Sequence, residues 1–298
     1  MAEKPGKPWT DRPAFRLRLP SGVVMDTSDR PLVMGILNVT PDSFSDGGQF
    51  YDHSAAVEHA RAMRASGADI LDIGGESTRP GSKPVSIEEE INRTCPVIQE
   101  VAPEVDVPIS IDTQKCAVAE AALDAGAEII NDVSALRTDP DLAALAADRD
   151  VPVVLMHMQG TPRTMQENPT YDEVVRDVMR WLEERIEYAV QAGIAEERLI
   201  VDPGFGFGKT LGHNLELLRR LHELHALGRP LMVGTSRKSM LGMILDAPPE
   251  ERLSGTLATV AAAVLAGCHV VRVHDVGPAM DAVRVCEAIR RGIDFENA

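Results

Sequence analysis

The sequence predicts an α/β protein, a (β/α)8 TIM barrel with an N-terminal β-hairpin. Apolar, strand-like runs alternate with helix-like stretches eight times, and each run is continuously apolar, as strands of a parallel sheet are. Several helix-like stretches end at a glycine just before the next run, which is typical of helix C-caps. An open, doubly wound sheet uses the same units, but eight units without a clear domain break favour the closed barrel.

The first expected element is the hairpin. Residues 13–31 contain two short alternating runs, FRLRL and VVMD, on either side of Pro20, Ser21 and Gly22, a pattern typical of a β-hairpin. We expect this hairpin to close one end of the barrel. Residues 1–12 are expected to form a disordered tail, so that residues 13–298 make one domain.

The eight strands and eight helices then follow in strict alternation. The expected strands are 32–37, 70–73, 108–111, 128–131, 152–156, 199–201, 230–233 and 270–273. The expected helices are 54–66, 86–101, 115–125, 139–148, 171–192, 213–227, 254–267 and 277–291. The helix at 254–267 carries the small, apolar stripe TLATVAAAVLAG, which suits packing on the barrel or against a partner subunit.

Composition excludes several classes of protein. A formal net charge of −16 argues against a nucleic-acid partner, because phosphates attract basic proteins. No apolar run approaches the ~20 residues that a membrane helix needs, so no membrane partner is expected. Residues 1–12 lack the apolar segment of a secretion signal, and we expect a cytoplasmic location. The four cysteines lack the paired spacing of a zinc site and are interpreted as reduced thiols.

Polar residues collect at the ends of the expected strands. In a (β/α)8 barrel the active site lies at the C-terminal ends of the strands. Polar side chains follow all eight runs, among them Asn38 after the first, Asp112 after the third and Asp202 after the sixth. This placement predicts one functional rim.

The loop after the first strand, VTPDSFSDGG, has the features of a closing loop. Pro41 restricts the backbone, whereas the two glycines that follow Asp46 free it. The loop also carries Phe44. An ordinary strand-to-helix turn is the alternative interpretation.

One group of rim residues suits a flat, nitrogen-rich ring. Asp112 and Asp202 offer carboxylates, Asn131 a carboxamide and Lys238 an amine, so that donors and acceptors of a heterocycle find opposite partners. Two further residues, Met156 and Phe207, are placed to line the faces of such a ring. For Asp112 a helix N-cap is the structural alternative.

A second group is basic and suits a diphosphate. It contains Arg79, Lys83, Arg272 and His274, with Asn38 as a neutral oxygen ligand for magnesium. The alternative is that these arginines pair with rim carboxylates such as Glu76 and Asp275.

Other motifs carry less. The glycine-rich stretch 204–209 lacks the spacing of a nucleotide-binding loop. His157 has no evident serine or cysteine partner and is interpreted as a packed or orienting residue. His213, His222 and His225 fall on one expected helix without a completing ligand and are interpreted as surface residues.

With these residues described, the chain strongly resembles the dihydropteroate synthase family. The matching motifs run in family order between residues 35 and 276: GILNVTPDSFSDGG, DIGGESTRPG, SIDTQK, IINDVSA, VVLMHMQGTP, DPGFGFGKT, GTSRKSMLG and VRVHDV. The resemblance implies that 6-hydroxymethyl-7,8-dihydropterin diphosphate and 4-aminobenzoate are joined to 7,8-dihydropteroate, with release of pyrophosphate and help from Mg²⁺. It further implies a homodimer and inhibition by sulfonamides.

The resemblance also implies a role for each matching residue. The pterin ring would be held by Asp112, Asn131, Asp202 and Lys238, with Met156 and Phe207 against it. The diphosphate would be held by Asn38, Arg79, Arg272 and His274, with Asn38 acting through the metal ion. The aminobenzoate pocket would consist of Phe44, Thr78, Arg79, Pro80, Lys238 and Ser239, with Asp46 helping to close the site.

The implied reaction is SN1-like. Catalytic roles fall to Asp112, Asp202, Lys238, Arg272 and His274. Two alternatives remain at this point: a pterin-dependent methyltransferase, which has no need of the first loop or of STRPG, and a pterin-binding paralogue without synthase activity.

Overall fold

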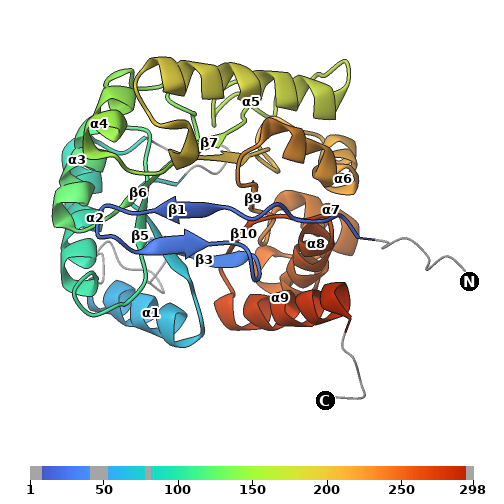
Figure 1. The fold of residues 1–298 in the computed structure, drawn as a ribbon, viewed down its shortest axis with the longest axis horizontal. Helices are drawn as coiled ribbons and strands as arrows, with labels where there is room; N and C mark the ends of the chain where they lie inside the picture. Colours follow the sequence, from blue (N-terminus) through green and yellow to red (C-terminus); the bar gives the residue numbers. More distant parts are fainter. Residues whose placement is uncertain (1–8, 41–52, 78–81, 83, 293–298) are drawn as a thin grey trace, which may run out of the picture.

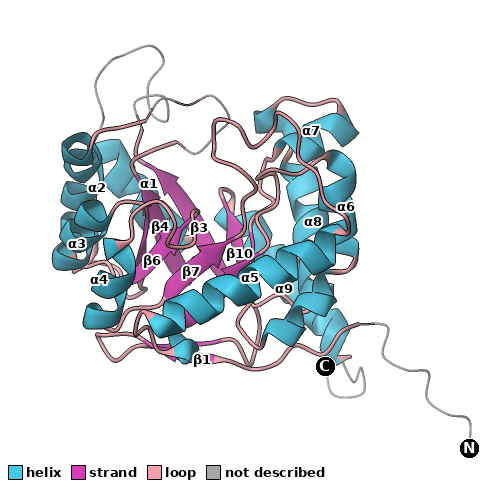
Figure 2. Ribbon diagram, turned by 90° about the horizontal axis from the view of Figure 1, so that it is seen from above, coloured by secondary structure: helices cyan, strands magenta, loops and turns pink. Residues whose placement is uncertain are grey.

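A computed structural model gives the fold, and it describes residues 9–40, 53–77, 82 and 84–292. Eight parallel strands form one sheet in the order β8-β7-β6-β5-β4-β3-β10-β9. A single parallel bridge from Val201 to Leu231 brings the two edges together. Helices surround the strands, as Figure 2 shows from above. The structure is therefore a nearly closed (β/α)8 barrel, and the open-sheet alternative is wrong.

The expected strands are confirmed with small changes at their ends. The barrel strands are β3 Leu32–Asn38, β4 Ile70–Gly74, β5 Ile109–Asp112, β6 Ile129–Asp132, β7 Val153–Met156, β8 Leu199–Asp202, β9 Met232–Val233 and β10 Val270–Val273. The helices are α1 His53–Ala65, α2 Ile87–Val101, α3 Cys116–Ala125, α4 Asp141–Arg149, α5 Val174–Gln191, α6 Leu211–Arg219, α7 Ser239–Leu245, α8 Leu253–Leu265 and α9 Val276–Arg291. Short 3-10 helices lie at η2 Glu196–Arg198, η3 Leu221–Leu227 and η4 Pro249–Glu251.

Two helical predictions were wrong in detail. The stretch expected as one helix over 213–227 is α6 followed by η3, because the backbone at Arg220 leaves the helical region (φ −111°, ψ 21°). As a result His213 and His225 lie on different elements, and both are half-buried. The short helix α7 was not expected, since its single apolar run contains Gly242 and is too brief to show helical periodicity.

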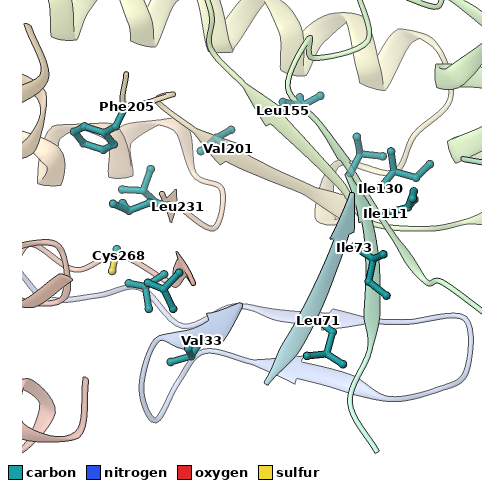
Figure 3. Packing of buried hydrophobic residues seen from close by; sticks show 14 of the residues in the cluster. Val33, Leu71, Ile73, Ile111, Ile130, Leu155, Val201, Phe205, Leu231 and Cys268 are labelled. Atoms are coloured by element: carbon teal, nitrogen blue, oxygen red, sulfur yellow. The ribbon is translucent and has the colours of Figure 1, made fainter. Parts of the chain in front are cut away.

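The barrel strands alternate between two apolar environments. Outward side chains such as Leu71, Ile73 and Ile111 pack beneath the helices in the main core, and Figure 3 shows them with Phe205 and Leu231. Inward side chains in the lower half of the barrel form a second cluster, which includes Met34, Ile70, Ile129, Val154, Ile200, Met232 and Val270. Side chains on one face of a strand recur every second residue, so the next inward positions are Asp72, Asn131, Asp202 and Arg272 on four of the strands, with Met156 as an apolar member on β7.

The hairpin closes the lower end of the barrel, as the sequence predicts. Its strands are β1 Arg16–Arg18 and β2 Val24–Asp26, paired antiparallel. Leu17, Leu19 and Met25 are buried in the lower apolar cluster. Figure 1 shows β1 running across the barrel strands. The polar end is therefore left as the face for function.

Arg12 lies just before the hairpin, and its Nη1 donates a hydrogen bond to Glu287 Oε1 of α9 at 2.5 Å. Of the tail expected over residues 1–12, residues 1–8 lie outside the described part, where the expectation stays a prediction, whereas Thr10 and Arg12 are hydrogen-bonded to Leu265 and Glu287. Within the described ranges, every helix falls short of the length and apolarity that a membrane crossing requires.

Candidate active site

Four strand ends deliver the polar residues that the sequence grouped for a ring-shaped ligand. Asp112 ends β5, Asn131 lies in β6, Asp202 ends β8, and Lys238 follows β9. The first three side chains are nearly enclosed, with exposed fractions of 9%, 2% and 4%. Asp202 and Asp112 both act electrostatically on the Lys238 ammonium. Asn131 is linked to Asp112 through Asp72 and Arg272. The structure thus gathers all four residues at the carboxyl ends of the strands, and we call this cluster the bowl.

The backbone around Asp202 is tightly specified. Its Oδ1 accepts a hydrogen bond from the Gly204 amide at 2.7 Å. Gly204 has φ +67°, and a Cβ there would lie 1.9 Å from the His157 carbonyl oxygen, so only glycine fits. This turn holds the Asp202 carboxylate where it interacts electrostatically with Lys238.

A buried lysine supports the same turn from below. Lys209 Nζ donates to the carbonyl oxygens of Gly204 at 3.0 Å and Phe207 at 3.1 Å, and it lies 2.8 Å from His157 Nδ1. Burial lowers the pKa of both Lys209 and His157 well below their ordinary values. His157 also packs edge-on against Trp181, which confirms that it is a packed residue.

One wall of the bowl is apolar. Met156, Val133, Met158 and Met165 form a small cluster against which Phe207 packs. The Lys238 ammonium lies 4.3 Å from the centre of the Phe207 ring, a cation–π contact. A flat ring entering the bowl would therefore meet apolar faces and polar edges.

Burial shifts the pKa values of the two carboxyl groups and of the lysine in the direction that favours their uncharged forms. Burial raises the pKa of Asp112 to about 7, although the Arg272 charge opposes this. Burial also raises the pKa of Asp202, against the attraction of Lys238. The pKa of Lys238 falls to about 8, again through burial. Perturbed carboxyl and amine groups that lie close together are typical of ligand-binding and catalytic centres.

Arg272 is paired, but with carboxylates other than the two named from the sequence. Its Nε donates to Asp72 Oδ2 at 2.6 Å, and its Nη2 donates to Asp112 Oδ2 at 2.6 Å. Glu76 instead pairs with Lys115, and Asp275 pairs with Arg237. The N-cap alternative for Asp112 is wrong, because Lys115 occupies the N-cap of α3.

The remaining predicted site residues lie on the same rim where they are described. His274 follows β10, and Ser236 Oγ lies 2.9 Å from its Nδ1. Asn38 ends β3 and is half-buried, and Ser239 is the exposed first residue of α7. Six predicted site residues lie outside the described residues: Phe44, Asp46, Thr78, Arg79, Pro80 and Lys83.

Sequence reasoning missed Asp72. This residue lies in the middle of β4, is fully buried, and contacts both Arg272 and Asn131. The available signal was an acidic residue inside the apolar run ILDIG, where a buried strand normally carries no charge.

Within the described ranges, no three His, Cys, Asp or Glu side chains form a group able to hold an ion. The donor that the sequence proposes, Asn38, supplies one neutral oxygen, which suits Mg²⁺ carried by phosphate oxygens and water.

Fold and site together define a class of protein: a barrel enzyme that holds a flat, nitrogen-rich small molecule at the carboxyl ends of its strands. Residues 34–274 match the family described as "Pterin binding enzyme". The dihydropteroate synthase of Escherichia coli K12 is 52% identical over 267 residues, which cover 90% of this chain and 94% of that protein. The enzyme of Synechocystis is 46% identical over 275 residues, covering 92% and 95%.

Solved structures agree. The Yersinia pestis dihydropteroate synthase in a sulfonamide complex superposes with a TM-score of 0.89 at 47% identity, covering 93% of this chain and all (100%) of that one. The Xanthomonas albilineans enzyme in complex with 7,8-dihydropteroate gives 0.84 at 45% identity, with coverage of 93% and 99%. The chain belongs to the dihydropteroate synthase family.

Proposed function

We propose that the bowl binds the pterin ring of 6-hydroxymethyl-7,8-dihydropterin diphosphate, which the chain joins to 4-aminobenzoate as a dihydropteroate synthase. The observation that carries this assignment is the convergence of Asp112, Asn131, Asp202 and Lys238 from four strand ends. Ionised carboxylates accept from ring and amino N–H groups, whereas the lysine donates to a ring acceptor. Met156 and Phe207 cover the faces of the ring.

The diphosphate is proposed to lie beside the bowl, against Arg272, His274, Asn38 and Arg79. Nε and Nη2 of Arg272 are engaged by carboxylates, which leaves its Nη1 to donate to a phosphate oxygen. Aminobenzoate would bind between the first two loops and the start of α7, at Phe44, Thr78, Arg79, Pro80, Lys238 and Ser239. Sulfonamides would occupy the same pocket, and Asp46 would help the first loop to close.

The reaction is proposed to be SN1-like. The bond between the pterin methylene carbon and the diphosphate oxygen breaks, and the oxygen leaves with the electron pair. Asp112 and Asp202 stabilise the electron-poor pterin, while Arg272 and His274 stabilise the departing diphosphate. The arylamine nitrogen then bonds to the methylene carbon and loses a proton to solvent. No strong general base is needed, because the cation is highly electrophilic.

Asn38 is the residue proposed to meet Mg²⁺. A single carboxamide oxygen at the end of β3 fits an ion that reaches the site with the diphosphate. When bound, the ion would neutralise charge on the leaving diphosphate.

A homodimer is proposed through α7 and α9, which flank α8 (Figure 1). Met243 and Ile244 on α7, and Val285 and Ile289 on α9, are exposed by 67%, 53%, 59% and 48%. Both helices pack against α8, and exposed large apolar side chains on neighbouring helices are typical of an interface. Val285→Asp should shift the protein to monomer in analytical ultracentrifugation, whereas Val190→Asp on α5 should leave its mass unchanged. The cytoplasmic location stays a prediction.

The decisive experiment follows pyrophosphate and dihydropteroate separately, with dihydropterin diphosphate and Mg²⁺, with and without 4-aminobenzoate. Coupled formation of both products is expected. Pterin binding without turnover would favour the non-catalytic paralogue instead. A requirement for a methyl donor would favour the methyltransferase.

A further inference from the structure

Asp72 is an unusual residue for its position. It lies inside β4, with an exposed fraction of 0%, between Leu71 and Ile73, which pack outward beneath the helices. Its side chain therefore points into the barrel, in the layer just below the bowl. Burying a carboxylate costs several kcal/mol even when it is paired, and an apolar residue would complete the strand without that cost. The fold alone does not account for this residue.

The contacts of Asp72 are with two residues of the bowl. Its Oδ2 accepts from Asn131 Nδ2 at 3.0 Å and from Arg272 Nε at 2.6 Å. An ionised carboxylate only accepts hydrogen bonds, so the Asn131 amide must turn its NH₂ group down towards Asp72. The Asn131 carbonyl oxygen is then left on the other side, as an acceptor for a ligand above it.

Arg272 is held between two carboxylates by the same arrangement. With Nε on Asp72 and Nη2 on Asp112, the guanidinium plane is fixed at two edges. Such charge-assisted bonds are among the strongest and most directional in proteins. Asp72 thus links the residue proposed for the pterin edge with the residue proposed for the diphosphate.

Two buried oxygens in this layer have no partner among the described residues. They are Asp72 Oδ1 and Ser110 Oγ, which belong to residues paired in register between β4 and β5. A buried polar atom left without a partner is costly. The Asp72 carboxylate is thus only half-satisfied by the described residues, which favours a role in the site over one in stability.

We propose that Asp72 is a positioning residue, which orients the Asn131 amide so that its oxygen faces the pterin and fixes the Arg272 guanidinium beside the diphosphate. This inference rests on the proposed function of the bowl. Asp72 touches neither substrate and acts through these two side chains.

The test is Asp72→Asn, which keeps the shape of the side chain and removes its charge. The Asn131 amide is then free to flip, and Arg272 keeps Asp112 as its anchor. We expect the Kd of 6-hydroxymethyl-7,8-dihydropterin to rise at least about tenfold, one factor of ten in an equilibrium constant being ~1.4 kcal/mol. The KM for 4-aminobenzoate should stay within about twofold, because its proposed residues do not contact Asp72. Ser110→Ala is the matched control from the same buried layer, and it should bind the pterin as the wild type does.

Two readouts separate positioning from a general loss of structure. In a double-mutant cycle, Asp72→Asn should cost less in an Asn131→Ala background than alone, since the shared contact is already gone. The acid limb of pterin binding should also move to lower pH. The pKa of Asp112 is raised by burial and further by the charges of Asp72, Glu90 and Asp132, against Arg272, so that removing the Asp72 charge lowers it.

Several outcomes would overturn the proposal. They are wild-type pterin affinity in Asp72→Asn, full additivity with Asn131→Ala, or an equal loss for both substrates with an unmoved acid limb. If Asp72→Asn does not fold, hydrogen exchange in the wild-type protein is measured instead. The side-chain amide protons of Asn131 should exchange slowly with solvent, and fast exchange would contradict the inference. Should the wild type neither bind pterin nor turn over, the proposed function fails instead.

Discussion

Asp112 and Lys238 are two site residues whose pKa values are shifted towards neutral pH. Burial raises the pKa of Asp112 to about 7 and lowers that of Lys238 to about 8. Both proposed contacts to the pterin need the charged form, the carboxylate as acceptor and the ammonium as donor. The two groups are charged together only in a narrow range of pH.

Pterin affinity should therefore show a narrow maximum. Below pH 7 Asp112 gains a proton and loses an acceptor site, so affinity should fall by up to about tenfold per pH unit. Above pH 8 Lys238 loses its proton, and affinity should fall again. Calorimetry across this pH range measures the affinity. The ligand is 6-hydroxymethyl-7,8-dihydropterin, which lacks the diphosphate, so that no change in diphosphate charge contributes to the profile. Asp112→Asn should bind more weakly and lack the acid limb, and an unchanged limb would assign it to another group.

Gly234 keeps the bowl open. It follows β9, and a Cβ there would lie 3.8 Å from Arg272 Cβ and 4.0 Å from Asp202 Oδ2. Gly234→Ala should therefore fit, whereas the two methyl groups of Gly234→Val would enter the ligand space. We expect Val to weaken pterin binding more than about tenfold, with the denaturation midpoint of both variants close to that of the wild type. Equal binding by the two variants would place the ring elsewhere.

The sequence was enough to group the four residues of the bowl, but not to find Asp72, which holds two of the site residues from below. Asp112, Asn131, Asp202 and Lys238 were predictable because each follows an apolar run, and strand ends meet at one rim. Asp72 was not, since its function depends on which inward position of β4 lies under Asn131 and Arg272. That register across the sheet is a tertiary property.

At the scale of elements, the segment between β8 and α6 combines the strictest backbone requirements with the site. Gly204, Gly206 and Gly208 all have positive φ. Two of them also face backbone at close range: a Cβ on Gly204 would meet the His157 carbonyl oxygen at 1.9 Å, and one on Gly208 the Gln159 carbonyl oxygen at 2.7 Å. The glycines that resembled a nucleotide loop therefore serve close packing under Asp202.

Gly204→Ala should lower the free energy of unfolding by about 3 kcal/mol, from the left-handed backbone and the clash together. Pterin binding should fall as well, because the Asp202 turn is displaced. Gly212→Ala is the control: it lies in the first turn of α6 with its nearest neighbour 3.9 Å away. That change should leave stability equal or higher by up to about 1 kcal/mol. Urea denaturation measures both.

Elements with several turns or strong apolar runs were predictable, and short ones were not. The helix α5, with 18 residues, was expected at nearly its observed place. The 7-residue α7 was missed, and its three exposed apolar residues, Met243, Ile244 and Leu245, do not form the buried stripe on which helix prediction depends.

Across the whole molecule, the barrel interior is divided into an apolar lower half and a polar upper half. The hairpin residues Leu17, Leu19 and Met25 complete the lower half. The lower ends of the strands therefore contribute mainly to stability, and the upper ends of the same strands to ligand binding.

Leu17→Ala should test this division. Its side chain is 3% exposed, and its truncation should cost about 2–5 kcal/mol of unfolding free energy through the cavity that it leaves. The KM values should not change. Val24→Ala on the same hairpin, where the side chain is 42% exposed, should lower the unfolding free energy by less. A matching loss of affinity in Leu17→Ala would mean that the two ends are coupled.

The pairing that closes the barrel, between β8 and the residues before β9, is short. β3 and β4 are paired over five residues, whereas β8 meets the residues just before β9 through a single bridge, Val201 to Leu231, in which the Val201 amide donates to the Pro230 carbonyl oxygen at 2.9 Å. Asp202 stands on one side of that pairing and Lys238 on the other. A ring bound to both residues would hold the two strands together and oppose local opening. Hydrogen exchange at the Val201 amide should therefore slow markedly when pterin binds. Substrate would then complete the mechanical closure of the barrel that encloses it.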